Sequence, residues 1–235
     1  MARIGKWTKI WAGGYHLSTY SRDVAPQSAA DEIEVGGYTQ DKQYMTGRLD
    51  GSITIDGFFE TTSHTALKTV GNTAVPVSIA LGNNATPATG DPAFCLNSVE
   101  TNYTSTPDLN GYVGLNVNFK TKSGKGLEIG TLLLDDTVTA DGNGSSVDNG
   151  ASSSNGGVGY LHITATSSGD TIAVTVQDSP DDAAWSDLVT FTIDGSAVAG
   201  ERVEVTGTVN QYVRAEYDVT GTDVSFPIAV SFVRY

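Results

Sequence analysis

The residues best suited to chemistry are few and lie far apart along the chain. The 235 residues include three histidines, His16, His64 and His162, and one cysteine, Cys95. A catalytic or metal site needs several such groups converging on one point. Each histidine stands alone in its segment, so each is interpreted as a surface or packing residue. Cys95, in "PAFCLNSVE", is interpreted as a small buried hydrophobic residue, and a single cysteine excludes an intramolecular disulfide framework.

Sequence motifs for chemistry are also missing. The chain contains no nucleophile elbow, no zinc-protease motif and no phosphate-cradling loop. The segment "DGNGSSVD" resembles the start of a calcium-binding loop, but Ser146 stands where that loop requires glycine and Ser152 where it requires glutamate. The sequence therefore predicts neither an enzyme nor a metal or cofactor site.

A second acidic stretch, "DSPDDAAWSDL", places four aspartates around Trp185. Two interpretations remain open. An exposed tryptophan beside carboxylates could stack on a sugar ring, with Trp185 and Tyr212 as glycan-contacting residues. Alternatively, the stretch is an acidic hairpin turn whose tryptophan closes one end of a core, which is favoured because tryptophan is mostly buried.

Charge narrows the range of partners. Asp and Glu number 27 against 13 Lys and Arg, which gives a formal net charge of −14. Nucleic-acid and anionic-membrane surfaces are bound by clustered basic residues, so neither partner is expected to be bound. The first residues lack the apolar core of a secretory signal, and no apolar run approaches the ~18 residues of a membrane span. The expectation is a soluble protein made in a cytoplasm.

Composition predicts two domains. Residues 141–159, "DGNGSSVDNGASSSNGGVG", are almost entirely Gly, Ser, Asn and Asp. Such a stretch has too little apolar surface to fold alone and is typical of a flexible linker. We predict an N-terminal β domain over 1–140, a linker over 141–157 and a C-terminal β domain over 158–235.

Strand patterns dominate both predicted domains. After the linker, short segments such as "DTIAVTVQD" and "DVSFPIAVSFVRY" alternate or are rich in β-branched and aromatic residues. They predict an antiparallel β-sandwich. Before the linker, "DEIEVG", "SITIDGFFE" and similar segments predict a β-sandwich or barrel. The one predicted helix is "TTSHTALKTVG", with a threonine cap and a terminal glycine. The predicted fold class is mainly β.

The residues from Asp31 to Val70, "DEIEVGGYTQDKQYMTGRLDGSITIDGFFETTSHTALKTV", resemble the core of the major tail (tail tube) proteins of long-tailed phages. The shared pattern is a strand, a polar loop, a second strand and a short helix. The segment "CLNSVETNYTSTPDLNGYVGLNVNFKTKSGKGLEIGTLL" is similar to the second half of that family. The C-terminal segment looks like Ig-like or carbohydrate-binding-like domains appended to tail exteriors.

This resemblance implies a structural virion protein, made in the host cytoplasm, whose sheet edges pair with other copies. Stacked, usually hexameric rings would form a tube with other tail proteins, and DNA would pass through it without specific binding. A chain ending near Thr139 should then still assemble. The alternative is a capsid decoration or adhesion protein that binds host surface glycans through its C-terminal sandwich.

The polar loop from Gly36 to Gly51 would reach the next ring, although an ordinary exposed loop is nearly as well supported. Aromatic residues, Met and Arg are enriched at interfaces. The expected contacts between subunits or rings are Tyr38, Gln43, Tyr44, Met45, Arg48, Ile53, Ile55, Phe58 and Phe59.

Overall fold

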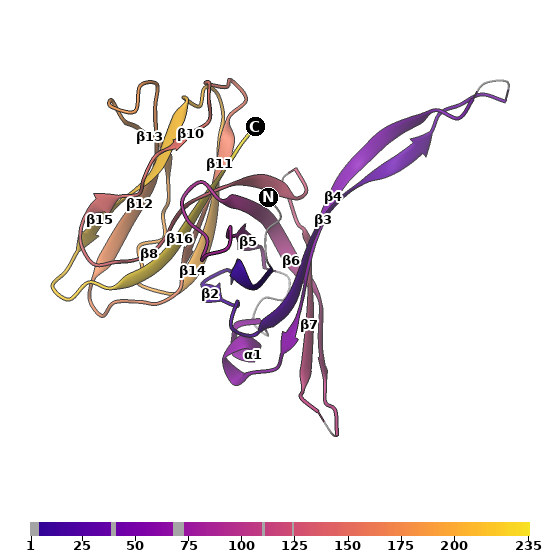
Figure 1. Cartoon of the computed structure of the whole chain (residues 1–235), viewed down its shortest axis with the longest axis horizontal. Helices are drawn as coiled ribbons and strands as arrows, with labels where there is room; N and C mark the ends of the chain where they lie inside the picture. The colour runs from indigo at the N-terminus through magenta and orange to yellow at the C-terminus, as the bar shows by residue number, and fades with distance from the viewer. Residues whose placement is uncertain (1–4, 39–40, 68–72, 110, 124) are drawn as a thin grey trace. The chain divides into compact units, whose positions relative to one another are not determined.

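The computed structural model describes residues 5–38, 41–67, 73–109, 111–123 and 125–235, and the mainly β prediction is confirmed (Figure 1). The chain divides into two compact units. Unit 1 consists of Met1–Thr19, Val75–Cys95 and Ile129–Tyr235, and unit 2 of Tyr20–Ala74 and Leu96–Glu128. This division differs from the predicted boundary because strands from distant parts of the chain pair with each other. One example is β8 (Glu128–Val138), which pairs with β16 (Phe226–Arg234).

The first sheet of unit 1 follows the order β14-β11-β16-β8-β6-β5-β1-β2. It curls back on itself: a Cβ added to Gly14, between β1 and β2, would lie 2.3 Å from the backbone nitrogen of Ala199, at the start of β14. A 3-10 turn, Gly5–Trp7, precedes it. Its remaining strands are β1 (Thr8–Ala12), β2 (Tyr15–His16), β5 (Val75–Leu81), the start of β6 (Pro92–Thr106), β11 (Gly157–Ile163) and β14 (Ala199–Val205).

Both faces of this curled sheet are apolar, which explains why β11 is buried at every position. Successive side chains of a strand point to opposite faces. Tyr160 therefore joins a cluster with Cys95 on one face, whereas Leu161 and Ile163 belong to the larger core on the other. The burial of Cys95 confirms the interpretation of that residue.

The second sheet of unit 1 packs on the larger core, to which it contributes Val174, Val176 and Ala215. Its order is β10-β15-β12-β13, and β9 also pairs with β15. Two antiparallel sheets thus enclose this core, to which β8, from before the predicted C-terminal domain, also contributes Leu133, Leu134 and Val138. The strands are β9 (Gly142–Asn143), β10 (Val147–Asp148), β12 (Thr171–Ser179), β13 (Ser186–Thr190) and β15 (Tyr212–Thr220).

Residues 141–157, predicted as a linker, are instead hydrogen bonded within unit 1. β9 and β10 both pair with β15, and Ser153 forms a bridge with Val209. The backbone nitrogen of Asn149 also donates to the carbonyl of Gln211 at 3.0 Å. Gly, Ser, Asn and Asp suit consecutive tight turns as well as free chain. Composition alone could not distinguish a linker from this segment, which runs along the edge of a sheet.

Unit 2 is built on four antiparallel strands in the order β3-β4-β7-β6. They are β3 (Ser21–Glu34), β4 (Tyr44–Phe58), β7 (Gly114–Thr121) and the second part of β6. One face carries a stripe of buried side chains, among them Ile53, Ile55, Val117 and Phe119. The predicted helix is confirmed as α1 (Thr61–Leu67), while its predicted end at Val70 and Gly71 lies outside the described residues.

α1 covers the buried face of the unit 2 sheet. His64 Nδ1 lies 2.6 Å from the hydroxyl of Tyr103, which stands opposite Val117 on that face. Leu67 is buried at 2 % exposure. None of the helices within the described ranges has the length and apolar character needed to cross a lipid bilayer.

Candidate assembly surface

β3 forms an edge of the unit 2 sheet. It has 14 residues, and its strand partner in the described chain is β4, which pairs on its other side with β7. Pro26 stands opposite Ile53 in this ladder. Because proline has no amide hydrogen to donate, its nitrogen is expected on the side of β3 that faces away from β4, which fits an edge strand. Apart from the position of Pro26, an edge of this length presents backbone groups that another chain can pair with.

The outer halves of β3 and β4 form a two-stranded arm. β7 pairs with β4 only over residues 52–58, whereas β3 and β4 remain paired out to Glu34 and Tyr44. Figure 1 shows this arm as a hairpin that extends well beyond the other strands of unit 2. Since isolated two-stranded hairpins are marginally stable in water, a surface that covers the arm would stabilise it.

The arm carries several exposed apolar side chains. Leu49 alternates along β4 with the buried Ile53 and Ile55. The β3–β4 register then shifts between Ala30 and Glu32, and beyond the shift Ile33 stands opposite Met45. The exposed fractions are 60 % for Met45, 59 % for Leu49 and 51 % for Ile33. The stripe that forms the core of unit 2 thus continues outward to Leu49, and Ile33 and Met45 form a second exposed apolar pair beyond the register shift. Apolar patches of this kind mark interaction sites.

The predicted contact residues fall into two groups. Tyr38, Gln43, Tyr44, Met45 and Arg48 are exposed on the arm or next to it, as a contact surface requires. Ile53 and Ile55 are buried, at 0 % and 2 %, because their alternation places them on the core face; this corrects their inclusion as surface contacts.

Phe58 and Phe59, the two adjacent aromatic residues, differ in how far they are buried. Phe58 is 40 % exposed and packs edge-on against Tyr112 at 4.7 Å between ring centroids, and Phe59 is half-buried beside His64. The sequence analysis missed Ile33 and Leu49. The signal for both was present: each continues a two-residue alternation into the polar loop.

The opposite face of the unit 2 sheet is a row of amides and hydroxyls. The Asn102 amide donates to Asn116 Oδ1 at 2.8 Å, and the Asn116 amide donates to Asp56 Oδ1 at 2.7 Å. The Thr104 hydroxyl donates to Asn102 Oδ1 at 3.2 Å. The row links β6, β7 and β4 across the strands. This face is hydrophilic, with Lys120 as its basic residue on β7.

Trp185 and Tyr212 lie in unit 1 and are both half-buried. The guanidinium of Arg214 lies 4.1 Å from the centroid of the Trp185 ring, and Arg214 Nη2 donates to Gln177 Oε1 at 2.9 Å. The arginine therefore occupies a face of the indole on which a sugar could stack. Neither of the two sequence interpretations anticipated this stacking.

The aspartates near Trp185 have structural roles. Asp181 Oδ1 accepts hydrogen bonds from the backbone nitrogens of Ala184 at 2.9 Å and Ala183 at 3.1 Å. These bonds, that of Ala184 first, lower the pKa of Asp181. Asp178 Oδ2 accepts one from the backbone nitrogen of Asn210 at 2.7 Å. The acidic stretch thus fixes a turn, and within the described residues no group of acids, histidines and cysteines is arranged to hold a metal ion.

Two of the three histidines, His16 and His162, lie against the ring of Trp11, with ring centroids 5.8 and 6.3 Å away. His162 is buried inside the curled sheet of unit 1. His64, on α1, contacts Tyr103, and His16 Nε2 lies 2.9 Å from the hydroxyl of Ser18. In none of these contacts does a histidine face another histidine or a cysteine. They act as packing and hydrogen-bonding residues in the part of the chain that the structure describes.

No family model and no curated protein matches the chain. Several solved structures are similar to the chain at low scores. A chain of the "virion of native gene transfer agent (GTA) particle" is 12 % identical over 54 % of this chain and 98 % of its own, with a TM-score of 0.43. The SPP1 Dit (gp 19.1) protein, described as a hub of the adsorption apparatus of phages, is 11 % identical over 97 % of this chain and 99 % of its own, at 0.34.

A chain of the phage p2 baseplate is 8 % identical over 97 % of this chain and 98 % of its own, with a TM-score of 0.32. Identities and scores this low describe a limited likeness of fold.

Proposed function

We propose that this chain is a non-enzymatic structural protein of a phage tail that assembles with copies of itself into rings. The observation that carries the proposal is the bare edge of β3, together with the arm that continues it. In each copy the unit 2 sheet begins at β3 and ends at the second part of β6. Pairing of the β3 edge with the β6 edge of the next copy would close the sheets into one barrel and remove the open edges.

The two faces of the unit 2 sheet support the same assembly. One face is apolar and covered by α1, so it suits the outside of a ring wall. The other carries the amide and hydroxyl row, and Asp23 stands opposite Asp56 across β3 and β4. A hydrophilic, acid-bearing face is suited to line a channel, since it would repel the phosphates of DNA passing through. The net charge of −14 favours the same behaviour.

The remaining parts of the proposal follow from the resemblance of residues 31–70 to tail tube proteins. The rings are hexameric, they stack with other tail proteins in the virion, and they are assembled from subunits made in the host cytoplasm. The exposed arm residues, led by Met45 and Leu49, contact the neighbouring copy. The C-terminal strands of unit 1 decorate the exterior. A glycan-binding role through Trp185 and Tyr212 is less well supported, because Arg214 occupies the Trp185 ring.

Ser28→Pro tests the edge pairing. Ser28 is exposed and two residues from Pro26, so its backbone nitrogen is expected to face away from β4 as well. The substitution removes one outward donor and leaves the β4 ladder intact. We expect Ser28→Pro to fold with an unchanged circular dichroism spectrum and to remain monomeric where the unsubstituted chain forms rings or tubes. Sedimentation velocity and negative-stain electron microscopy measure the difference.

Ser28→Thr is the matched control, because it changes the same side chain and keeps the amide hydrogen. It should assemble like the unsubstituted chain. Rings formed equally well by Ser28→Pro would exclude β3 pairing, and an unsubstituted chain that stays monomeric at high concentration in several salts would overturn the ring proposal itself.

A further inference from the structure

Two hollows on unit 1 have a pair of adjacent aspartates in common, Asp135 and Asp136 on β8. Both residues line both hollows. The first hollow has a volume of about 300 Å³ and extends to Lys9, His16 and Thr164. The second, about 390 Å³, extends to Thr89, Asn143 and Tyr217. We call them together the β8 cleft; each is of the size of a small-ligand site.

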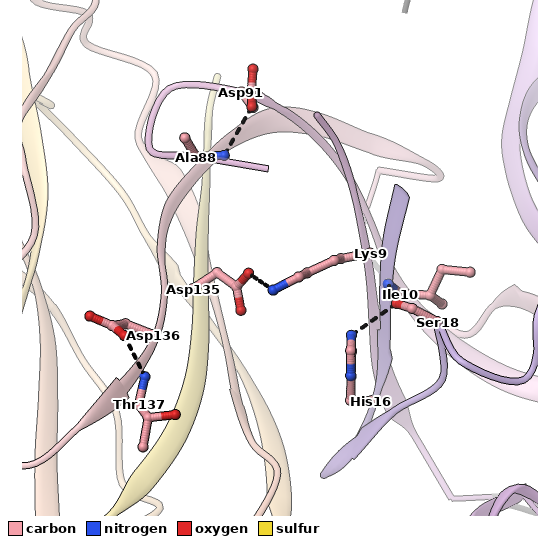
Figure 2. A network of polar contacts seen from close by, with 9 residues as sticks. All are labelled: Lys9, Ile10, His16, Ser18, Ala88, Asp91, Asp135, Asp136 and Thr137. Atoms are coloured by element: carbon pink, nitrogen blue, oxygen red, sulfur yellow. Dashed lines mark hydrogen bonds and ion pairs between the residues drawn. The ribbon is translucent and has the colours of Figure 1, made fainter. Parts of the chain in front are cut away.

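The first hollow is organised around an ion pair that crosses between strands. Lys9, on β1, donates to Asp135 Oδ2 on β8, as Figure 2 shows. Their side chains are 26 % and 14 % exposed, so both remain reachable. An ammonium has three donor hydrogens and a carboxylate can accept about four hydrogen bonds. The pair therefore retains hydrogen-bonding capacity toward a ligand in the hollow.

The rest of the lining alternates donors and acceptors. Asp136 accepts from the backbone nitrogen of Thr137 at 2.7 Å and is itself exposed. Hydroxyls, an amide and an imidazole complete the walls, and Trp11 lies behind them with its ring centroid 5.8 Å from that of His16. Few apolar groups are available to hold a hydrophobic ligand.

The charged side chains of the β8 cleft disfavour an anionic ligand. The one ammonium lining the cleft is already paired with Asp135, while the Asp136 carboxylate is exposed. A phosphate or sulfate group would meet like charge and find no free cation. A neutral polyhydroxylated molecule needs dense donors and acceptors, which the lining provides, and it is not repelled by the Asp136 carboxylate.

We propose that the β8 cleft binds a neutral oligosaccharide, whose neighbouring rings occupy the two hollows, one ring hydrogen bonded to Asp135 and the next to Asp136. The site is distinct from Trp185 and Tyr212, and its residues belong wholly to unit 1. Binding at this site does not depend on ring formation.

The experiment uses the full-length chain labelled with ¹⁵N and neutral trisaccharides of glucose, galactose and N-acetylglucosamine as probes. We expect at least one trisaccharide to give saturable chemical-shift changes at residues of the β8 cleft, with a dissociation constant on the order of 1 mM. Asp136→Ala should weaken that binding roughly tenfold, the effect of losing one hydrogen bond to a charged group. Asp136 is exposed, so the variant is expected to fold.

Asp223→Ala is the matched control, since it removes an exposed aspartate of unit 1 outside the cleft. It should bind as the unsubstituted chain does. The proposal is overturned if no trisaccharide shifts the cleft residues, if Asp136→Ala binds unchanged, or if only inorganic phosphate or calcium chloride produces shifts. Ring formation by the same sample, measured separately, reports on the assembly proposal alone.

Discussion

His162 lies inside the curled sheet with both ring nitrogens hydrogen bonded. Nδ1 is 2.8 Å from the carbonyl oxygen of Gly13 and Nε2 is 2.8 Å from the hydroxyl of Ser78. The carbonyl can only accept, so Nδ1 carries the hydrogen, and in the neutral ring Nε2 accepts from Ser78. Burial lowers the pKa of His162 to about 4, against a smaller opposing effect of the Gly13 bond. The ring is therefore neutral at physiological pH.

This burial predicts a loss of stability in mild acid. As the pH falls from the ordinary histidine value of 6.5 toward 4, the unfolded chain binds a proton that folded His162 does not. The free energy of unfolding should decrease by up to about 1.4 kcal/mol per pH unit over this window. Urea unfolding across the window measures the slope, which should be shallower in His162→Gln. A His162 ring resonance that titrates near its ordinary value in the folded chain would contradict the prediction.

Asp218 should destabilise the folded chain at neutral pH. Its pKa is raised above 3.8, first by a hydrogen bond with Asp141 and then by repulsion from the same residue. A raised carboxyl pKa means that the folded chain holds the proton more tightly, so the penalty is present above the folded pKa and disappears in acid.

Asp218→Asn should therefore raise the melting temperature at pH 7, because an amide can donate to Asp141 without repulsion. The gain should vanish below about pH 3, where the aspartate is protonated in both states. Thermal unfolding at the two pH values measures both effects. Asp223→Asn, an exposed acid elsewhere in unit 1, is the control and should show neither.

At the scale of elements, the apolar stripe of β4 is buried at one end and exposed at the other. Ile55 is buried in unit 2, whereas Leu49 on the same face of the same strand is exposed. Ile55→Ala should cost about 2–5 kcal/mol of unfolding free energy. Leu49→Ala should change it by no more than about 0.5 kcal/mol in the monomer. Chemical denaturation of the two variants gives the comparison, and equal losses would show that the arm is packed in the monomer.

Most strands and the helix could be predicted from the sequence, because a two-residue alternation or a capped apolar face is a local signal. The arm was harder to place. The residues around Gly47 lack the apolar density of a strand, yet β4 continues through them because β3 pairs alongside. The same limit applies to 141–157, whose pairing with β15 is set by residues far away in sequence. The β8 cleft was missed for this reason: Lys9 and Asp135 meet only after folding.

At the scale of the whole molecule, the two units replace the predicted boundary with an interleaved one. Unit 1 needs strands from the beginning, the middle and the end of the chain. The resemblance to tail tube proteins predicts that a chain ending near Thr139 still assembles. The structure gives the opposite expectation, since that chain would lack β11 and β16 and would expose Leu132 and Leu133, both 0 % exposed in the complete fold.

Truncation after Thr139 should therefore yield an insoluble or unfolded product. Expression, circular dichroism and size-exclusion chromatography of the truncated chain test this. A soluble, cooperatively unfolding fragment would show that the N-terminal segments have a core of their own, as the composition had indicated.

The three-segment construction of unit 1 also sets a time order during synthesis. β1 and β5 leave the ribosome long before β11, β14 and β16, with which they complete the curled sheet. Unit 1 therefore cannot close until the last of these strands, Phe226–Arg234, has been translated. Until then the early strands lack their partner strands. A nascent chain that stalls upstream of β16 should therefore be a target for chaperones and proteases.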